Sequence, residues 1–83
     1  MNLENAGKDW TDEDYTMLGV WFFAGASLKE LQRRLRRTAR TVADKLVGMQ
    51  LLTKDRNGLY YRNGGDAWCD QYDIRCVDEE LEE

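Results

Sequence analysis

Apolar residues recur with helical spacing near the start of the chain. Trp21 and Phe22 follow Leu18 by three and four residues, which places all three on one side of a helix. Gly25 comes directly after this pattern and is the residue type that tolerates the left-handed conformation beyond a helix end. The pattern therefore predicts a first helix over about residues 12–24.

Short polar side chains indicate where three helices begin. Thr11 and Ser27 are each followed three residues later by an acid, Asp14 and Glu30, which is the spacing of a capping box. Thr38 precedes a further stretch with helical spacing and can cap it in the same way. We expect three successive helices, the second over about residues 28–35.

The second and third helices each have one apolar side. In the second helix the core residues are predicted to be Leu28, Leu31 and Leu35. We expect its other side chains to point away from the core, namely Lys29, Gln32, Arg33 and Arg36. In the third helix the residues predicted to face the core are Val42, Leu46 and Met49.

The polar side of the third helix predicts a nucleic-acid interface. Its start and outer side carry Arg37, Arg40, Thr41, Asp44 and Lys45. Two capped helices joined by about three residues are typical of a helix-turn-helix, in which the second helix enters the major groove of DNA. A purely structural alternative for Arg40 is an ion pair with Asp44, one helical turn later.

A β-hairpin is predicted directly after the third helix. Asn57-Gly58 is the strongest two-residue hairpin signal, and it separates two extended stretches, 53–56 and 59–62. This turn would place Lys54 opposite Tyr61 and Arg56 opposite Leu59. Lys54, Arg56 and Arg62 would then be available to DNA phosphates, as in the wing of a winged helix. In the alternative interpretation, Tyr60 or Tyr61 covers the core and the charged residues only keep the hairpin hydrated.

The C-terminal part of the sequence is predicted to have two regions. Gly64-Gly65 is interpreted as a hinge in a short docking segment, 64–77. Trp68, Tyr72 and either Ile74 or Cys76 are expected to form the apolar side of a short helix or an extended segment there. Trp68 either docks on the helical core or serves as an exposed anchor for a partner protein. Residues 78–83 are predicted to form a disordered acidic tail. This tail solubilises the chain, occupies the protein's own basic face in competition with DNA, or contacts a basic partner.

Length and charge add two constraints to this picture. A chain of 83 residues forms one domain with a small core, here expected over 10–63 after a flexible N-terminus at 1–9. The net charge of −4 is unevenly distributed, because residues 29–45 contain seven basic and two acidic residues while both flanks are acidic. Such a basic region can recruit phosphate even in a protein that is acidic overall.

Several functional classes are disfavoured by composition. The longest apolar run, Met17–Ala26, is too short to span a bilayer, so we expect a cytoplasmic, nucleoid-associated protein without membrane contact. The chain has no histidine and two cysteines, Cys69 and Cys76, which are expected to remain free thiols. We therefore predict no metal site, no cofactor and no catalytic residues, and interpret the protein as a non-enzyme.

The stretch from Trp10 to Leu52, WTDEDYTMLGVWFFAGASLKELQRRLRRTARTVADKLVGMQLL, resembles the Myb/SANT-like, homeodomain-like tri-helical domains of small bacterial and phage regulators. About half the chain is covered. The matching positions follow the family's spacing without gaps and are Trp10, Thr11, Trp21, Gly25, Ser27, Leu31, Leu35, Arg37, Thr38, Val42, Lys45, Leu46, Met49 and Leu51. Three positions depart from the family pattern: Arg36 and Gln50 replace glycines, and Gln32 replaces a small residue.

The resemblance implies sequence-directed binding of double-stranded DNA by the third helix. In such domains the positions that contact DNA correspond to Arg37, Thr38, Arg40, Thr41 and Lys45. To these we add Arg36, Asp44, Lys54 and Arg56 from their places in the predicted helices and hairpin. Arg40 is the first choice for base readout, because arginine paired with guanine is the commonest specific contact.

We therefore predict a mainly α-helical fold: a tri-helical helix-turn-helix, a short winged-helix-like β-hairpin and an acidic C-terminal tail. The predicted function is that of a small DNA-binding transcriptional regulator. One such module contacts few bases, so useful specificity requires a homodimer, a second DNA-binding protein or a hairpin contact. The alternative is an adaptor or inhibitor of a protein of the transcription or nucleic-acid machinery, bound through Trp68, Tyr72 and the acidic flanks.

Overall fold

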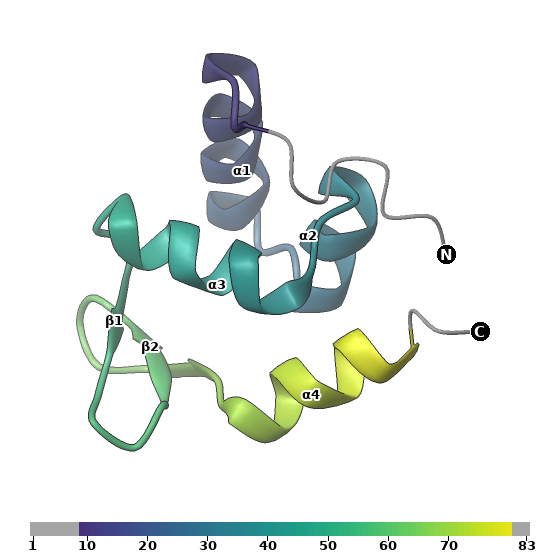
Figure 1. The fold of residues 1–83 in the computed structure, drawn as a ribbon. Coiled ribbons are helices and arrows are strands. Elements are labelled where there is room, and N and C mark those ends of the chain that lie inside the picture. The colour runs from purple at the N-terminus through teal and green to yellow at the C-terminus, as the bar shows by residue number, and fades with distance from the viewer. Residues whose placement is uncertain (1–8, 81–83) are drawn as a thin grey trace.

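Three helices begin the described part of the chain. The computed structural model describes residues 9–80 (Figure 1). Its first three elements are α1 (Asp12–Phe23), α2 (Leu28–Leu35) and α3 (Ala39–Gly48). They are followed by β1 (Leu52–Lys54), β2 (Tyr60–Arg62), β3 (Ala67–Cys69) and α4 (Gln71–Glu79). The prediction of three successive helices is confirmed.

The predicted N-caps occupy the starts of these helices. Thr11 Oγ1 accepts from the Asp14 N–H at 3.1 Å, and the Asp14 carboxylate accepts from the Thr11 N–H at 3.0 Å. Ser27 and Thr38 cap α2 and α3 through their hydroxyls. The second capping box is only half formed, because the Glu30 carboxylate accepts from Arg34 instead. These bonds satisfy N–H groups that a helix leaves without internal partners.

Each of the three helices is followed by a residue with positive φ, at a position where the sequence predicts a left-handed turn. Gly25 follows α1 with φ of 94° and donates to Phe22, while Ala26 donates to Trp21, which is a Schellman motif. Arg36 and Gln50, which stand where the Myb/SANT-like pattern that the sequence resembles has glycine, have φ of 56° and 64°. Within residues 9–80 they are the only non-glycine residues with positive φ. The left-handed turns are therefore retained without glycine, at a cost in backbone strain.

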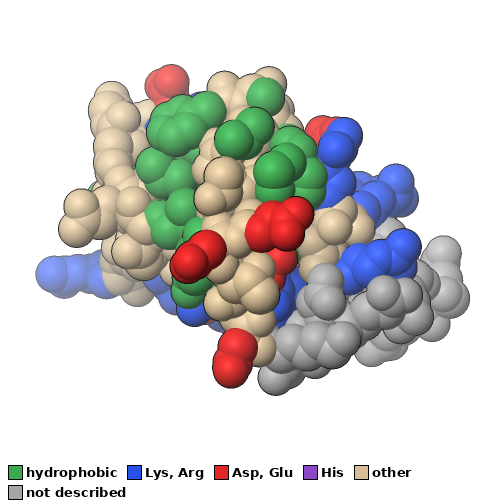
Figure 2. All heavy atoms as spheres, turned by 90° about the horizontal axis from the view of Figure 1, so that it is seen from above, with side chains coloured by type: hydrophobic (Ala, Val, Ile, Leu, Met, Phe, Trp, Pro, Cys, Tyr) green, Lys and Arg blue, Asp and Glu red, His purple; other side chains and the backbone are tan. Residues whose placement is uncertain are grey.

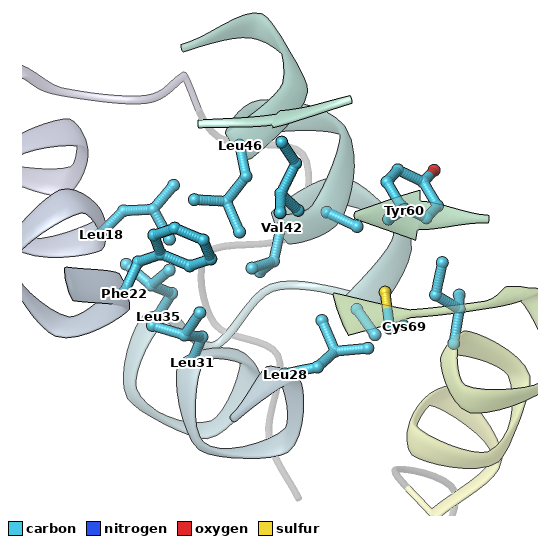
Figure 3. Packing of buried hydrophobic residues seen from close by; sticks show 13 residues of the cluster. Leu18, Phe22, Leu28, Leu31, Leu35, Val42, Leu46, Tyr60 and Cys69 are labelled. Carbon is cyan, nitrogen blue, oxygen red and sulfur yellow. The ribbon is translucent and has the colours of Figure 1, made fainter. Parts of the chain in front are cut away.

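The core lies where the first three helices meet the sheet (Figure 3). The leucines predicted for α2 are buried, as are Val42 and Leu46 of α3, and Met49 is partly buried against them. Tyr60 and Cys69 enter the same core from the sheet. The expectation that Gln32 points to solvent is wrong, because only 1% of its surface is exposed. Gln32 lies one turn after Leu28 at the border of the leucine side, and α4 also packs against α2.

The predicted hairpin exists, but its register differs from the prediction. In the structure Lys54 pairs with Tyr60 and Thr53 with Tyr61, so Lys54 is not opposite Tyr61. The turn contains five residues, 55–59, instead of two. Asp55 causes this difference, because its Oδ1 accepts from the N–H groups of Asn57 and Leu59 and closes a longer turn.

The region after the hairpin is more ordered than predicted. Gly64-Gly65 forms the turn of a second hairpin rather than a hinge, and β3 adds to β2 in a three-stranded antiparallel sheet of order β1-β2-β3. A capping box of Asp70 and Asp73 then begins α4. The predicted docking segment 64–77 is thus a strand and most of a helix, and the predicted tail is helical through Glu79. Residues 81–83 of that tail and 1–8 of the N-terminus lie outside the described residues.

Helix α4 lies alongside α3 and returns the chain toward α2 (Figure 1). Ile74 is its buried residue, with 1% of its surface exposed. The sheet lies near the C-terminal end of α3, which β1 follows in the chain. Among residues 9–80, no helix has the length and apolar character needed to cross a membrane.

Candidate nucleic-acid interface

One side of α3 remains open after the other elements have packed around it. This side carries Arg40 and Asp44, which are exposed, and Thr41 and Lys45, which are partly exposed. The exposed Lys54 of β1 reaches the same side, as described below. We call these five residues the α3 face. The structure thus brings together five of the nine residues that sequence analysis predicted to contact DNA.

Arg37 does not belong to this face. The residue is 3% exposed, and its guanidinium carbon lies 4.4 Å from the centre of the Trp10 ring. It also donates to the Asp9 carbonyl at 3.2 Å and forms an ion pair with Asp14 at 3.5 Å. Arg37 thus lies at the start of the third helix, one of the two places predicted for it, but its charge is enclosed by Asp9, Trp10 and Asp14 instead of being exposed to solvent.

Thr38 is occupied with the start of α3. Its hydroxyl accepts from the Thr41 N–H at 3.3 Å and donates to the Thr41 hydroxyl at 2.8 Å. The Thr41 hydroxyl accepts this bond, so its own hydrogen remains available for a ligand acceptor. Thr38 therefore orients Thr41, and Thr41 is the residue of the two that can contact a ligand.

Arg40 is held by a residue that sequence analysis missed. Its Nη2 donates to Oε1 of Gln71, the first residue of α4, at 2.9 Å. Gln71 Nε2 in turn donates to the Gly58 carbonyl at 2.9 Å, so one amide connects α3, α4 and the β1–β2 turn. Gly58 has φ of 83°, and a Cβ there would lie 2.7 Å from the Gln71 side chain. The turn therefore requires glycine both for its backbone conformation and for the close approach of Gln71.

Asp44 is oriented by a buried tyrosine. Tyr60 is 0% exposed, and its hydroxyl donates to Asp44 Oδ1 at 2.6 Å. Burial first, and then the hydrogen bond and charge of Asp44, raise the pKa of Tyr60 to about 12, so the phenol is a neutral donor at physiological pH. Lys54 Nζ lies 5.2 Å from the centre of the Tyr60 ring. These contacts replace the ion pair between Arg40 and Asp44 that was the structural alternative for Arg40.

Lys45 forms the other edge of the α3 face, beside α1. Its Nζ donates to the Tyr15 hydroxyl at 3.3 Å and lies 5.6 Å from the centres of the Tyr15 and Trp10 rings. The rings of Trp10 and Tyr15 are in turn 5.6 Å apart. Aromatic side chains thus support a lysine whose charge remains at the surface.

The remaining predicted residues lie around this face or away from it. Arg36 is exposed in the α2–α3 turn and Arg56 in the β1–β2 turn. Trp68 packs edge to face on Phe22 with ring centres 5.4 Å apart, so its docking on the core is confirmed. Tyr72, the other residue proposed for protein interaction, is 66% exposed on α4.

Acidic residues of α4 lie next to the beginning of α3. Asp78 Oδ1 accepts from the Ala39 N–H at 2.7 Å, at the helix terminus where anions are favoured. Glu80 pairs with Lys29 of α2 at 2.7 Å, and the hydrogen bond and charge of Lys29 lower the pKa of the Glu80 carboxyl. A groove of about 450 Å³ between α3 and α4 is lined by residues of both charges, namely Arg40, Gln71, Ile74, Arg75, Asp78 and Glu79.

Gln71 and Asp78 were not predicted as part of the site, because the segment after Trp68 was left open as a short helix or an extended segment and residue 78 was assigned to the tail. The signal was present, since Asp70 and Asp73 have the spacing of a capping box with an acid in both positions. The role of Tyr60 could not be assigned, because the contact with Asp44 depends on the register of β1 and β2. The spacing of residues along the chain predicts that register only if the length of the turn between the strands is also predicted correctly.

The described residues contain two free cysteines and no group of metal ligands. Within 9–80 no group of three histidine, cysteine, aspartate or glutamate side chains could hold a metal ion. Cys69 and Cys76 are free thiols. Burial first, and then the charges of Asp73 and Asp70, raise the pKa of Cys69 to about 12, so this thiol is protonated at physiological pH.

Comparisons with known proteins do not identify a relative of this chain. No known family, curated protein or solved structure matches it.

Proposed function

We propose that this protein binds double-stranded DNA through the α3 face and acts as a small transcriptional regulator. In this proposal α2 and α3 form a helix-turn-helix and the β1–β2 hairpin is its wing, in keeping with the resemblance to Myb/SANT-like domains. Helix α3 lies in the major groove, and the hairpin lies beside the adjacent phosphates.

The single observation that carries the proposal is the open, oriented polar side of α3. Arg40 and Asp44 are exposed, and each is held by a residue of another element: Arg40 donates to Gln71 at 2.9 Å, and Asp44 accepts from Tyr60 at 2.6 Å. Arginine donates to guanine O6 and N7, and a carboxylate accepts from the cytosine amino group. Residues held in place before binding lose less conformational freedom when they contact a base.

Positive charge around this face supports phosphate contacts. The exposed residues Arg36, Lys54 and Arg56 come from the two turns and the strand that flank α3. Arg37 is excluded from the proposed contacts by its burial and is assigned to the fold. The acids at the end of α4 oppose binding at the N-terminus of α3, so we expect modest affinity that decreases with salt.

The adaptor interpretation is less well supported by the same residues. Trp68, its main proposed anchor, uses its ring against Phe22, while Tyr72 remains exposed. A hot spot is usually an aromatic side chain that is buried by the partner and not by its own core. Tyr72 alone does not define a protein-binding site.

Fluorescence anisotropy with a randomised double-stranded DNA pool tests the proposal. With three phosphate contacts, the affinity should fall about 40-fold between about 50 and 200 mM salt, because each contact contributes about 0.9 to the logarithmic slope. Arg40→Ala should weaken binding, and sites selected from the pool by the wild type should not be preferred by this variant. The contact of Arg40 with its preferred base pair should favour that base pair over the others by roughly 1–3 kcal/mol of binding free energy.

Arg33→Ala is the matched control. It removes the same charge from an exposed arginine of α2 that lies outside the α3 face. The proposal requires Arg40→Ala to reduce affinity and selectivity more than Arg33→Ala does. Equal effects of the two variants, or no binding by the wild type at low salt, would contradict it.

A further inference from the structure

Asp44 is an acid on the surface that we propose contacts DNA. It is exposed on α3, one helical turn after Arg40. An ionised carboxylate accepts hydrogen bonds and donates none, and its charge repels phosphate. Asp44 therefore weakens the attraction of the DNA backbone, and the partner that suits it is a group that donates a hydrogen bond.

A buried phenol fixes the position of this carboxylate. The hydroxyl of Tyr60, a residue of β2, donates to Asp44 Oδ1 at 2.6 Å. Figure 3 shows the Tyr60 ring among the core side chains with its oxygen directed away from them. Because the ring is enclosed, the phenol cannot follow a carboxylate that moves away. A carboxylate has lone pairs for about four hydrogen bonds, so Asp44 keeps acceptor capacity for a ligand.

The supports of Arg40 and Asp44 meet at the same phenol. Burial and Asp44 raise the pKa of Tyr60, while a hydrogen bond with Gln71 and the charge of Arg40 act in the opposite sense. Gln71 is also the residue that accepts from Arg40, at 2.9 Å. The donor Arg40 and the acceptor Asp44 thus have a fixed relative position. Four residues of helix span about 6 Å, and base pairs are about 3.4 Å apart, so the two side chains are separated by about two base-pair steps.

We infer that Tyr60 is a positioning residue that fixes Asp44 as an acceptor for the amino group of cytosine. The α3 face then selects sites with a guanine and, within about two base pairs of it, a cytosine. This inference rests on the proposed DNA binding and deepens it. In the major groove cytosine presents an amino donor, whereas guanine and thymine present the acceptors O6 and O4. Adenine has an amino group, but its N7 acceptor lies beside it and is unfavourable to a second carboxylate oxygen.

The distribution of charge over the molecule supports this role for Asp44. Figure 2 views the molecule from the side on which α1 lies in Figure 1 and shows hydrophobic side chains with acidic ones beside them, while basic side chains lie toward the edges. Acids on that side are far better suited to repelling phosphate than to binding it. The neighbours of Asp44 on the α3 face are instead basic, namely Arg40, Lys45 and Lys54. An acid held among phosphate-binding groups lowers affinity for DNA in general and contributes selectivity by excluding the wrong bases.

Selection of sites by the full chain from a randomised double-stranded DNA pool, followed by sequencing, tests the inference. The wild type should enrich sites with guanine and cytosine at the stated separation. Asp44→Asn keeps an oxygen that accepts from Tyr60, but asparagine pairs with N6 and N7 of adenine. Its selected sites should therefore contain adenine in place of the cytosine. Its affinity for random DNA should rise roughly threefold, because a negative charge is removed.

Tyr60→Phe tests the positioning, because it keeps the ring in the core and removes only the hydroxyl that holds Asp44. The affinity for random DNA should be unchanged. The preference for cytosine should fall by roughly fivefold, which is near the lower end of what one base contact supplies. Tyr61→Phe is the matched control, since it removes a hydroxyl from the next, partly exposed residue of β2, and it should leave the base preference unchanged.

The outcomes separate this inference from the proposed function. A wild type that binds no DNA would overturn both. A wild type that binds DNA without preferring cytosine would overturn the inference alone, as would an Asp44→Asn variant that keeps the wild-type preference. So would a Tyr60→Phe variant whose preference changes no more than that of Tyr61→Phe. A change of preferred base from cytosine to adenine cannot result from misfolding, nor from a purely structural role of Asp44 as the partner of Tyr60.

Discussion

Arg37 and Arg40 are three residues apart in one basic stretch but have different environments. Arg37 is enclosed by Trp10, Asp14 and the Asp9 carbonyl, whereas Arg40 is exposed on α3. An enclosed arginine stabilises the fold through hydrogen bonds and cation–π contact. An exposed arginine contributes little to stability and is available to a ligand.

We predict that Arg37→Ala lowers the free energy of unfolding by about 2 kcal/mol, because it removes a buried cation–π contact and a charge-assisted hydrogen bond. Arg40→Ala should change it by less than about 0.5 kcal/mol. Urea denaturation followed by circular dichroism measures both values. Similar destabilisation by the two substitutions would show that the burial of Arg37 has little energetic importance.

Gln50 is a residue in a conformation that suits glycine, with φ of 64°. We predict that Gln50→Gly stabilises the protein by about 1 kcal/mol, since a side chain in the left-handed region has a steric cost. Gly25→Ala is the reciprocal test. A Cβ at Gly25 meets no atom within 4 Å, so its destabilising effect would come from the backbone alone, at φ of 94°. Urea denaturation, with an m-value that does not change, measures the free energy of unfolding of both variants relative to the wild type.

At the scale of elements, each of the four helices begins with a side-chain cap that is local in sequence. The cap of α1 is also connected to the core, because Asp14 binds the Thr11 N–H and pairs with the buried Arg37. The bond from the Thr11 N–H first, with a further contribution from Arg37, lowers the pKa of Asp14 below its usual 3.8. Folding therefore favours the ionised carboxyl.

The lowered pKa of Asp14 predicts that the stability of the fold depends on pH in the acidic range. A carboxyl with a lowered pKa in the folded state contributes its stabilisation fully above about pH 3.8 and loses it as the pH falls below that value. Wild-type stability should therefore decrease more steeply below about pH 4 than that of Asp14→Asn. Thermal denaturation at a series of pH values tests this, with Asp12→Asn as the control in the same turn. Equal slopes for wild type and Asp14→Asn would refute the expectation.

Gln71 connects three elements, so its substitution should affect all of them. We predict that Gln71→Leu speeds amide hydrogen exchange in the turn 55–59 and increases the mobility of the Arg40 side chain, because both hydrogen bonds of the amide are lost. Gln71→Glu keeps an acceptor for Arg40 but cannot donate to the Gly58 carbonyl. It should affect the turn and leave Arg40 ordered. Nuclear magnetic resonance measures exchange in the turn and relaxation of the arginine side chain.

At the scale of the whole molecule, the acidic end of α4 lies against the basic part of the chain. Asp78 binds the N-terminus of α3 and Glu80 binds Lys29 of α2. These contacts place negative charge close to where DNA phosphate would approach. If the protein binds DNA as proposed, this arrangement of the net charge of −4 reduces its non-specific attraction to DNA at the α3 face.

We predict that the double variant Asp78→Asn, Glu80→Gln binds random DNA more tightly at low salt, by roughly threefold for each charge removed, as expected for charges at or near the surface. The amide that replaces the Asp78 carboxylate retains an oxygen that accepts from the Ala39 N–H, so α3 keeps its cap. Asp66→Asn, in the β2–β3 turn, is the control for net charge. Unchanged affinity in the double variant would exclude the screening role of α4.

The bounds of the first two helices and the start of the third could be predicted closely because capping and helical spacing act within a few residues. Thr11, Ser27 and Thr38 each cap the helix expected of them. The hairpin was predicted with the wrong register, because Asp55 closes a longer turn than Asn57-Gly58 alone would form. The strand β3 and helix α4 were not separated in advance, since short apolar stretches between glycines and acids fit either element.

The sequence by itself determined the first three helices, the positions of the left-handed turns and the concentration of basic residues in α2 and α3. Only the tertiary structure decided that Arg37 is internal, that Gln71 and Tyr60 orient Arg40 and Asp44, and that Phe23 remains uncovered. The reason is physical. Caps and helical periodicity depend on neighbours along the chain, whereas burial and orientation depend on elements that are distant in sequence and meet only when the core forms.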